Sequence, residues 1–94
     1  MSEHIHANHN FFDCLKKAKE ELHALLEIHP ELAELSPREI EVFDLLLSDK
    51  TLAKIAEELV ISYSSVHFHC KNIYRKLNLS SRRQLLMTYK DLYE

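Results

Sequence analysis

Hydrogen-bonding and cationic side chains recur at helical spacing between residues 62 and 77, and they are the residues best suited to chemistry in this sequence. On a helix they would share one face, with no carboxylate among them. The residues of this face are Ser64, His67, Phe68, Lys71 and Arg75, with Asn72 beside them. Lysine can donate to guanine and an aromatic ring can press on a thymine methyl group, so the face could contact base edges in a DNA major groove. A solvated face of an ordinary amphipathic helix would carry similar residues, and this segment by itself leaves both interpretations open.

The opposite face of the same segment predicts how it is held. Its apolar residues recur at the helical period, which indicates one buried stripe; they are Val66, Cys70, Ile73 and Leu77. Ser62 can cap the helix, because its hydroxyl can accept a hydrogen bond from a free backbone N–H. No Pro or Gly interrupts the run before Asn78. We therefore predict a helix over residues 63–77 that is anchored through its apolar face.

Two shorter helices are predicted before this segment. The tetrapeptide S-P-R-E begins at Ser36, which can cap a helix, and Glu39 can reach back to complete a capping box. Thr51 can cap a second helix over residues 52–59, and Ser62 starts the next helix after about three residues. Two short helices joined by so short a turn form a helix-turn-helix. This arrangement favours the DNA-contacting interpretation of the polar face.

Composition predicts an all-α fold. Ninety-four residues make one small domain, and a hydrophobic content of 46% argues against disorder. The chain has no Gly and only two Pro, so tight hairpins and phosphate-cradling loops are difficult to build. A last helix is predicted from Arg82 to about Leu92, with Leu85, Leu86 and Tyr89 on its apolar side.

Charge is distributed unevenly along the chain. The net charge is −3, but residues 1–50 hold five Lys and Arg against eleven Asp and Glu, whereas residues 51–94 hold seven against four. From Ser62 to Arg83 there is no acidic residue, and the cations are Lys71, Arg75, Lys76, Arg82 and Arg83. Local charge governs contact with phosphates, so the positive segment matters more than the negative total.

The first third of the chain predicts a tail and an added helix. Residues 1–9 are expected to form a flexible tail, because nothing nearby would fix their histidines around a metal. Residues 10–34 are expected to form an amphipathic helix ended by Pro30, followed by a connector. The apolar seam of this helix includes Leu15 and Leu22. It could pack on the rest of the chain or on a second copy, as in a coiled coil.

Several functions are not expected from this sequence. No segment has the apolar run needed to cross a membrane, and the N-terminus lacks the features of a signal peptide, so we predict a cytoplasmic protein. Cys14 and Cys70 are expected to be reduced thiols. His69 and Cys70 are neighbours that point in different directions on a helix, so we predict no enzyme activity. We also expect no metal and no cofactor.

The motifs of residues 35–94 resemble those of the LuxR-type (GerE-like) helix-turn-helix domain. The run L-S-P-R-E-I-E-V-F from Leu35 is similar to the family's opening pattern L-T-x-R-E-x-E-V-L. Further motifs fall at the family's spacings: I-A-E-E-L at 55–59, V-I-S at 60–62, S-V-H-F-H at 65–69, N-I-Y-R-K-L at 72–77 and S-R at 81–82. The resemblance implies a four-helix domain over residues 35–94, whose third helix lies in the major groove.

The resemblance also implies roles for individual residues. The base-contacting positions of the family correspond to His67, Phe68 and Lys71, while Ser64 and Ser65 would meet phosphates or base edges. Asn72 lies on the same face. The candidates for contact with the phosphate backbone are Lys54, Arg75 and Lys76. The last helix commonly forms the dimer interface, which would involve Leu85, Leu86 and Tyr89, with Leu15 and Leu22 as further candidates on the added helix.

Three positions depart from the family pattern. His67 stands where a Lys is usual, which predicts weaker affinity for DNA and binding that tightens as the pH falls through about 6.5. Asp49 stands where the family has Gly before the second helix, and Asp tolerates left-handed backbone geometry better than most residues. His69 corresponds to a position that usually packs inside the domain.

The sequence thus predicts a bacterial transcription regulator, or the output domain of one, that binds double-stranded DNA as a homodimer. The thirty-four residues before the domain are too few for a receiver or ligand-binding module. One alternative is a promoter-reading region of a sigma factor, which would act with RNA polymerase. A second is a helical adaptor that contacts protein instead of DNA, in keeping with the uncharged His67 and Phe68.

Overall fold

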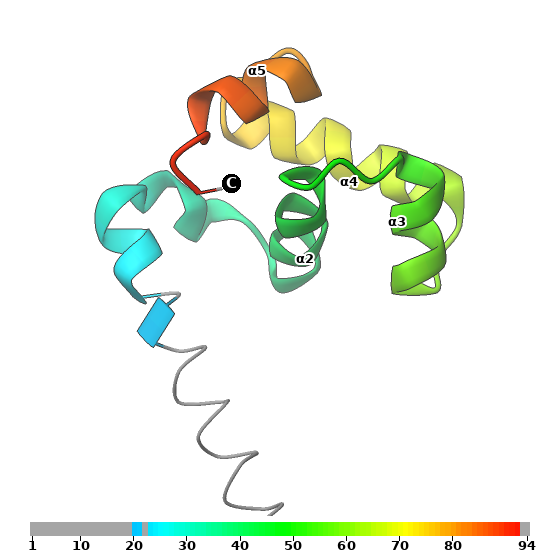
Figure 1. Cartoon of the computed structure of the whole chain (residues 1–94), viewed down its shortest axis with the longest axis horizontal. Coiled ribbons are helices and arrows are strands. Elements are labelled where there is room, and N and C mark those ends of the chain that lie inside the picture. Colours follow the sequence, from blue (N-terminus) through cyan, green and yellow to red (C-terminus); the bar gives the residue numbers. More distant parts are fainter. Residues whose placement is uncertain (1–19, 22, 93–94) are drawn as a thin grey trace, which may run out of the picture. The chain divides into compact units, whose positions relative to one another are not determined.

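The computed structural model describes residues 20–21 and 23–92, and within them every regular element is a helix. The elements are the 3₁₀ helix η1 (Pro30–Glu34) and the α-helices α2 (Pro37–Leu46), α3 (Leu52–Leu59), α4 (Tyr63–Lys76) and α5 (Arg82–Thr88), drawn in Figure 1. The predicted all-α fold class is confirmed. The chain divides into two compact units between Glu31 and Leu32.

The first unit contains the end of the added helix. Residues 20–21 and 23–28 are helical, and the amide of His29 donates to the carbonyl of Leu25 at 2.7 Å. The helix stops before Pro30, as predicted. The seam residues Leu15 and Leu22, the histidines of the tail and Cys14 lie outside the described residues.

The second unit begins with a core residue where a simple connector was expected. Leu32 lies in η1 and is only 3% exposed, and Leu35 is also buried. The amide of Leu35 donates to the carbonyl of Leu32 at 3.1 Å. A 3₁₀ helix has three residues per turn, so two leucines three apart face the same side. That spacing is a signal that the short segment before Ser36 packs on the domain.

The predicted start of α2 is confirmed in detail. The hydroxyl of Ser36 accepts from the amide of Glu39 at 3.2 Å, and the carboxylate of Glu39 accepts from the amide of Ser36 at 2.9 Å. Pro37 occupies the first helical turn, where its missing N–H costs no hydrogen bond. The buried apolar residues of α2 are Val42, Phe43 and Leu46.

The turn between α3 and α4 is built around a left-handed valine. Val60 has φ 55° and ψ 48°, and the amide of Ile61 donates back to the carbonyl of Ala56 at 3.0 Å, which closes the end of α3. Among the described residues, positive φ values occur at Val60 and Asn78. The expectation of left-handed geometry at Asp49 is therefore wrong, because the hydrogen bonds that demand this geometry lie at the other end of α3.

The helix α4 is held as the apolar pattern predicts. The hydroxyl of Ser62 accepts from the amide of Ser65 at 3.0 Å, and the stripe residues Val66, Cys70, Ile73 and Leu77 are all buried. The stripe packs against α2 and α3. The helix ends at Lys76, where Asn78 takes φ 58° and the amide of Leu79 donates to the carbonyl of Tyr74 at 2.7 Å.

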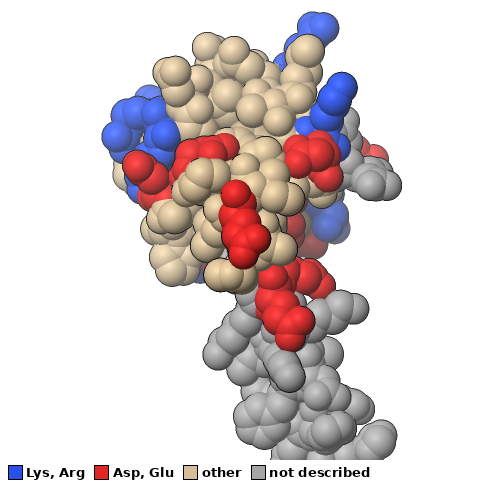
Figure 2. Space-filling model, turned by 90° about the vertical axis from the view of Figure 1, so that its left-hand side faces the viewer, with Lys and Arg blue, Asp and Glu red and all other residues tan. Residues whose placement is uncertain are grey.

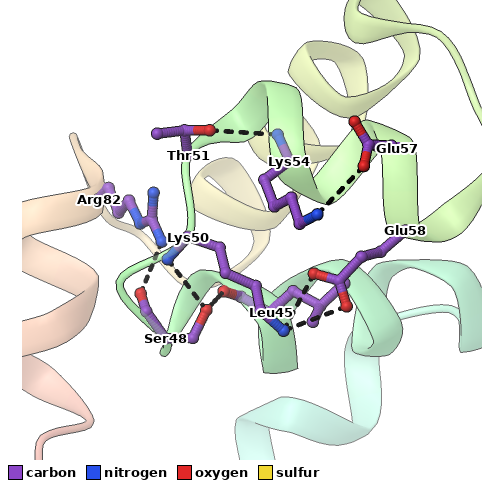
Figure 3. A network of polar contacts seen from close by, with 8 residues as sticks. All are labelled: Leu45, Ser48, Lys50, Thr51, Lys54, Glu57, Glu58 and Arg82. Atoms are coloured by element: carbon purple, nitrogen blue, oxygen red, sulfur yellow. Dashed lines mark hydrogen bonds and ion pairs between the residues drawn. The ribbon is translucent and has the colours of Figure 1, made fainter.

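The last helix is shorter than predicted and is tied to α2. It ends at Thr88, because Tyr89 leaves the helical conformation and turns its ring edge-on against Phe43, with 5.2 Å between ring centroids. Arg82 at its start donates through Nε to the carbonyl of Leu46 at 3.1 Å. Its Nη2 donates to the carbonyl of Ser48 at 2.7 Å (Figure 3). Arg82 thus satisfies carbonyls that the end of α2 leaves without helical partners.

Candidate nucleic-acid interface

The polar side of α4 is presented outward along the whole helix. We define the outer face as Ser64, His67, Phe68, Lys71, Asn72 and Arg75. Asn72 is half-buried and the other five residues are exposed. Phe68 is 62% exposed, so its ring is accessible to a group outside the chain. The structure therefore brings the predicted residues of this face together on one accessible surface.

Serine hydroxyls surround the start of α4. The hydroxyl of Ser62 lies 2.8 Å from that of Ser65 and 3.3 Å from that of Ser64. Ser65 is half-buried, whereas Ser64 is exposed. The first amides of a 14-residue helix carry partial positive charge, so an anion at this end would meet favourable backbone dipoles and the Ser64 hydroxyl together.

Two cations of the outer face have no carboxylate partner among the described residues. Lys71 forms no ion pair in that part of the chain, and Arg75 donates to the neutral side-chain oxygen of Asn72 at 3.1 Å. They lie one helical turn apart, and α4 contains no acidic residue. Their positive charge is therefore available to an external anion.

Lys76, predicted as a phosphate contact, has a partner inside the domain. Its Nζ lies 2.7 Å from Oε1 of Glu39, whose side chain is only 7% exposed. Burial by itself would raise the pKa of Glu39, but the hydrogen bonds from Lys76 and the Ser36 amide outweigh burial and lower that pKa. Lys76 thus neutralises a buried carboxylate, and a phosphate would have to compete with it.

Lys54, near the start of α3, also has a carboxylate partner. Its Nζ lies 3.1 Å from Glu57, while the neighbouring Lys50 pairs with Glu58 at 3.0 Å (Figure 3). The hydrogen bond and the attraction from Glu57 raise the pKa of Lys54. Because the Lys54 pair is exposed, it is weak and a phosphate could replace the carboxylate.

Tyr63 belongs to the same surface and was missed in the sequence. It is the first residue of α4, its side chain is 52% exposed, and its ring centroid lies 5.0 Å from that of His67. Four residues separate the two, the spacing that makes helical side chains neighbours. The signal for this contact in the sequence is the four-residue spacing of the two rings on a helix.

Acidic side chains gather elsewhere on the molecule. Glu41 and Asp44 are exposed on α2, where Glu41 pairs with Arg38 at 3.4 Å. Figure 2 shows a face on which Asp and Glu side chains lie across the middle and Lys and Arg side chains at the margins. Such a face would repel a phosphate backbone, so only part of the surface suits nucleic acid.

The predicted dimer residues of α5 divide into two groups. Leu85 is fully buried and Tyr89 is 2% exposed, so both belong to the core and neither is available for a surface contact in this structure. An apolar stripe on a short helix marks the core as readily as an interface, which is why the sequence could not separate the two. Leu86 is half-buried, and the exposed apolar residue beside it is Met87.

The cysteine in α4 serves the core. Cys70 is free and buried, and burial raises the pKa of its thiol. The pKa of its hydrogen-bond partner Tyr74 is raised to about 12, also chiefly by burial. A raised thiol pKa disfavours the nucleophilic thiolate. His69 is half-buried, in keeping with its predicted place at the edge of the core.

The described residues contain neither a candidate metal-binding cluster nor a candidate membrane-spanning helix. No cluster of three or more His, Cys, Asp or Glu side chains in residues 20–21 and 23–92 could hold a metal ion. Within the same residues, no helix is both long and apolar enough to cross a membrane.

The short turn between α3 and α4, with a buried stripe on one side of α4 and a polar outer face on the other, defines a helix-turn-helix domain. The profile of the family described as "Bacterial regulatory proteins, luxR family" matches residues 33–89. The chain belongs to the LuxR family of bacterial regulatory proteins, and the predicted resemblance is confirmed.

The similar proteins differ greatly in length. The spore germination protein GerE of Bacillus subtilis is 45% identical over 53 residues, which cover 56% of this chain and 72% of GerE. The HTH-type transcriptional regulator MalT of Vibrio campbellii is 34% identical over 68 residues, or 69% of this chain but only 8% of MalT. The transcriptional regulatory protein LiaR of Bacillus subtilis is 42% identical over 50 residues, 53% of this chain and 24% of LiaR. No solved structure matched the chain significantly.

Proposed function

We propose that this chain is a sequence-specific DNA-binding transcription regulator, or the output domain of one, that places α4 in the major groove. The observation that carries the proposal is the outer face of α4, which is exposed and free of carboxylates while the opposite side of the helix is buried. A helix fixed from behind can enter a groove as a rigid body. Family membership and the names of the relatives MalT and LiaR support the same function.

Different residues of the outer face, and two cations near it, would contact different parts of the DNA. His67, Phe68 and Lys71 would contact base edges, with Phe68 on a thymine methyl group and Lys71 on guanine O6 or N7. Near them, Ser64, Ser65 and Asn72 would bind phosphates or base edges. Arg75 would bind a phosphate, and Lys54 and Lys76 would do so only by leaving Glu57 and Glu39.

We propose further that the protein acts as a homodimer in the cytoplasm. Helix-turn-helix dimers bind half-sites about one helical turn of DNA apart. On α5 the contact would involve Leu86 with the exposed Met87. Leu15 and Leu22 of the added helix, which lie outside the described residues, are the candidates for a separate dimer contact. Contact with RNA polymerase would follow at the promoter.

Selection of bound duplexes from a randomised pool tests the proposed function. The parent chain is expected to enrich a motif, and Lys71→Ala is expected to lose preference for guanine at one position by roughly 5- to 100-fold. Lys90→Ala is the matched control, because Lys90 is an exposed cation outside α4. An equal change of motif in both variants would contradict the proposed role of Lys71.

The exposed Phe68 supports a second candidate, a domain that binds protein. Under this alternative the parent would bind no duplex even at low salt, whereas a DNA-binding domain binds non-specifically under those conditions. The salt dependence of a partner's binding separates the two further, since contact through Phe68 would be nearly insensitive to salt.

A further inference from the structure

Tyr63 and His67 form a ring pair on the surface of α4. Their centroids lie 5.0 Å apart and their planes meet at 63°, the edge-to-face arrangement that aromatic rings prefer. Both side chains are exposed. By contrast, the ring pair of Phe43 and Tyr89 lies in the core, where Tyr89 is 2% exposed.

Because they differ in burial, the two ring contacts have different effects on the protein. The core pair fills space, whereas the surface pair buries little and chiefly restricts the rotamers of its members. An edge-to-face contact favours one ring orientation several-fold. The imidazole of His67 is therefore held beside Tyr63 before anything binds.

Ring orientation decides what a histidine can recognise. A neutral imidazole has one donor and one acceptor nitrogen on different edges of the ring. In the major groove, guanine offers two acceptors, while adenine offers an acceptor and a donor. A freely rotating imidazole can satisfy either base, but one held in a single orientation presents one nitrogen toward the groove and favours one partner.

Resting on the proposed DNA-binding function, we propose that Tyr63 is a positioning residue that holds His67 against a base edge and thereby sets the base preference at that position. The ring of Tyr63, rather than its hydroxyl, does this work. The DNA-facing surface therefore includes a residue whose effect passes through His67.

The test is a set of base-preference measurements on the full chain. Parent, Tyr63→Phe, Tyr63→Ala, Tyr63→Leu, His67→Ala and the double variant Tyr63→Ala/His67→Ala are compared by selection from a randomised duplex. We expect Tyr63→Ala, Tyr63→Leu and His67→Ala to weaken preference at the same base pair by roughly 2- to 10-fold, and Tyr63→Phe to retain it. The double variant should lose no more than His67→Ala.

Three results would overturn the pairing. Additive losses in the double variant, or losses at different base pairs, would show that Tyr63 acts independently of His67. A loss with Tyr63→Phe equal to that with Tyr63→Ala would assign the effect to the hydroxyl. A parent that binds no duplex at all would overturn the proposed function itself, a result distinct from these three.

A measurement on the free protein keeps the two proposals separable. In NMR spectra the ring protons of His67 are expected to shift when Tyr63→Leu removes the neighbouring ring, and to stay close to the parent positions in Tyr63→Phe. Unchanged His67 shifts in Tyr63→Leu would show that the rings do not pair in solution. Equal thermal midpoints of the variants would establish that each is folded.

Discussion

The cations of α4 and α5 fall into two groups that differ in what lies beside them. Arg82 and Lys76 are half-buried and bind groups of the domain itself, the carbonyls after α2 and the carboxylate of Glu39. Lys71 and Arg75 are exposed and have no carboxylate partner among the described residues. The same residue types therefore stabilise the fold in one place and face outward in the other, and only the neighbouring groups distinguish them.

The largest expected effect comes from removing two adjacent arginines one at a time, one with partners inside the domain and one exposed. Arg82→Ala removes two hydrogen bonds from a charged donor, so we expect the free energy of unfolding to fall by about 2–3 kcal/mol. Arg83→Ala removes an exposed cation and should change it by less than about 0.5 kcal/mol. Urea unfolding measures both free energies. An equal change in the two variants would contradict the structural role assigned to Arg82.

The buried ion pair predicts a smaller, pH-dependent effect. Glu39→Gln should lower the free energy of unfolding at pH 7 by about 1–2 kcal/mol, since it replaces a charge-assisted hydrogen bond to Lys76 with a neutral one. The pKa of Glu39 is lowered in the folded state, so its contribution is complete above the pKa of the unfolded chain and is lost as the pH falls through the folded pKa. The difference between parent and variant should therefore narrow as the pH falls below about 4.5, the ordinary pKa of a glutamate.

A gap between parent and Glu39→Gln that stays constant down to pH 3 would contradict this account of the ion pair. Glu41→Gln is the matched control, because Glu41 lies on the same helix and is exposed. Its stability curve should follow that of the parent at every pH.

Val60 is an exposed residue whose backbone conformation nevertheless affects the stability of the fold. Left-handed geometry costs a β-branched residue about 1–2 kcal/mol, and Val60 is 88% exposed, so packing does not offset that cost. Val60→Gly should raise the free energy of unfolding by roughly 0.5–1 kcal/mol after the greater entropy of unfolded Gly is included. Chemical denaturation measures the gain, and a loss of stability would mean that the turn is not strained.

Much of the fold could be predicted because its signals are local. The capping box at Ser36, the cap at Ser62 and the apolar stripe of α4 each depend on residues a few positions apart. Left-handed geometry was expected at Asp49, where the family has Gly. It occurs at Val60 instead, because the hydrogen bonds that close the end of α3 require a left-handed residue there.

The partners of the site residues could not be predicted in the same way. Lys76 and Glu39 are 37 positions apart, and Arg82 reaches carbonyls 34 and 36 positions away. Helical periodicity predicts which face of a helix a residue lies on, but it does not predict which group, distant in sequence, that residue contacts. For the same reason Leu85 and Tyr89 were predicted at an interface, although they pack in the core.

The outward cations of α4 are proposed to bind DNA, whereas the inward cations of α4 and α5 stabilise the fold. The measurement that separates these roles is the salt dependence of binding to a random-sequence duplex, with parent, Arg75→Ala and Lys90→Ala measured side by side. We expect a log–log slope of several units for the parent, a slope smaller by about one for Arg75→Ala, and no change for Lys90→Ala. An identical slope for the parent and Arg75→Ala, or no binding at low salt, would show that the outward cations do not bind DNA.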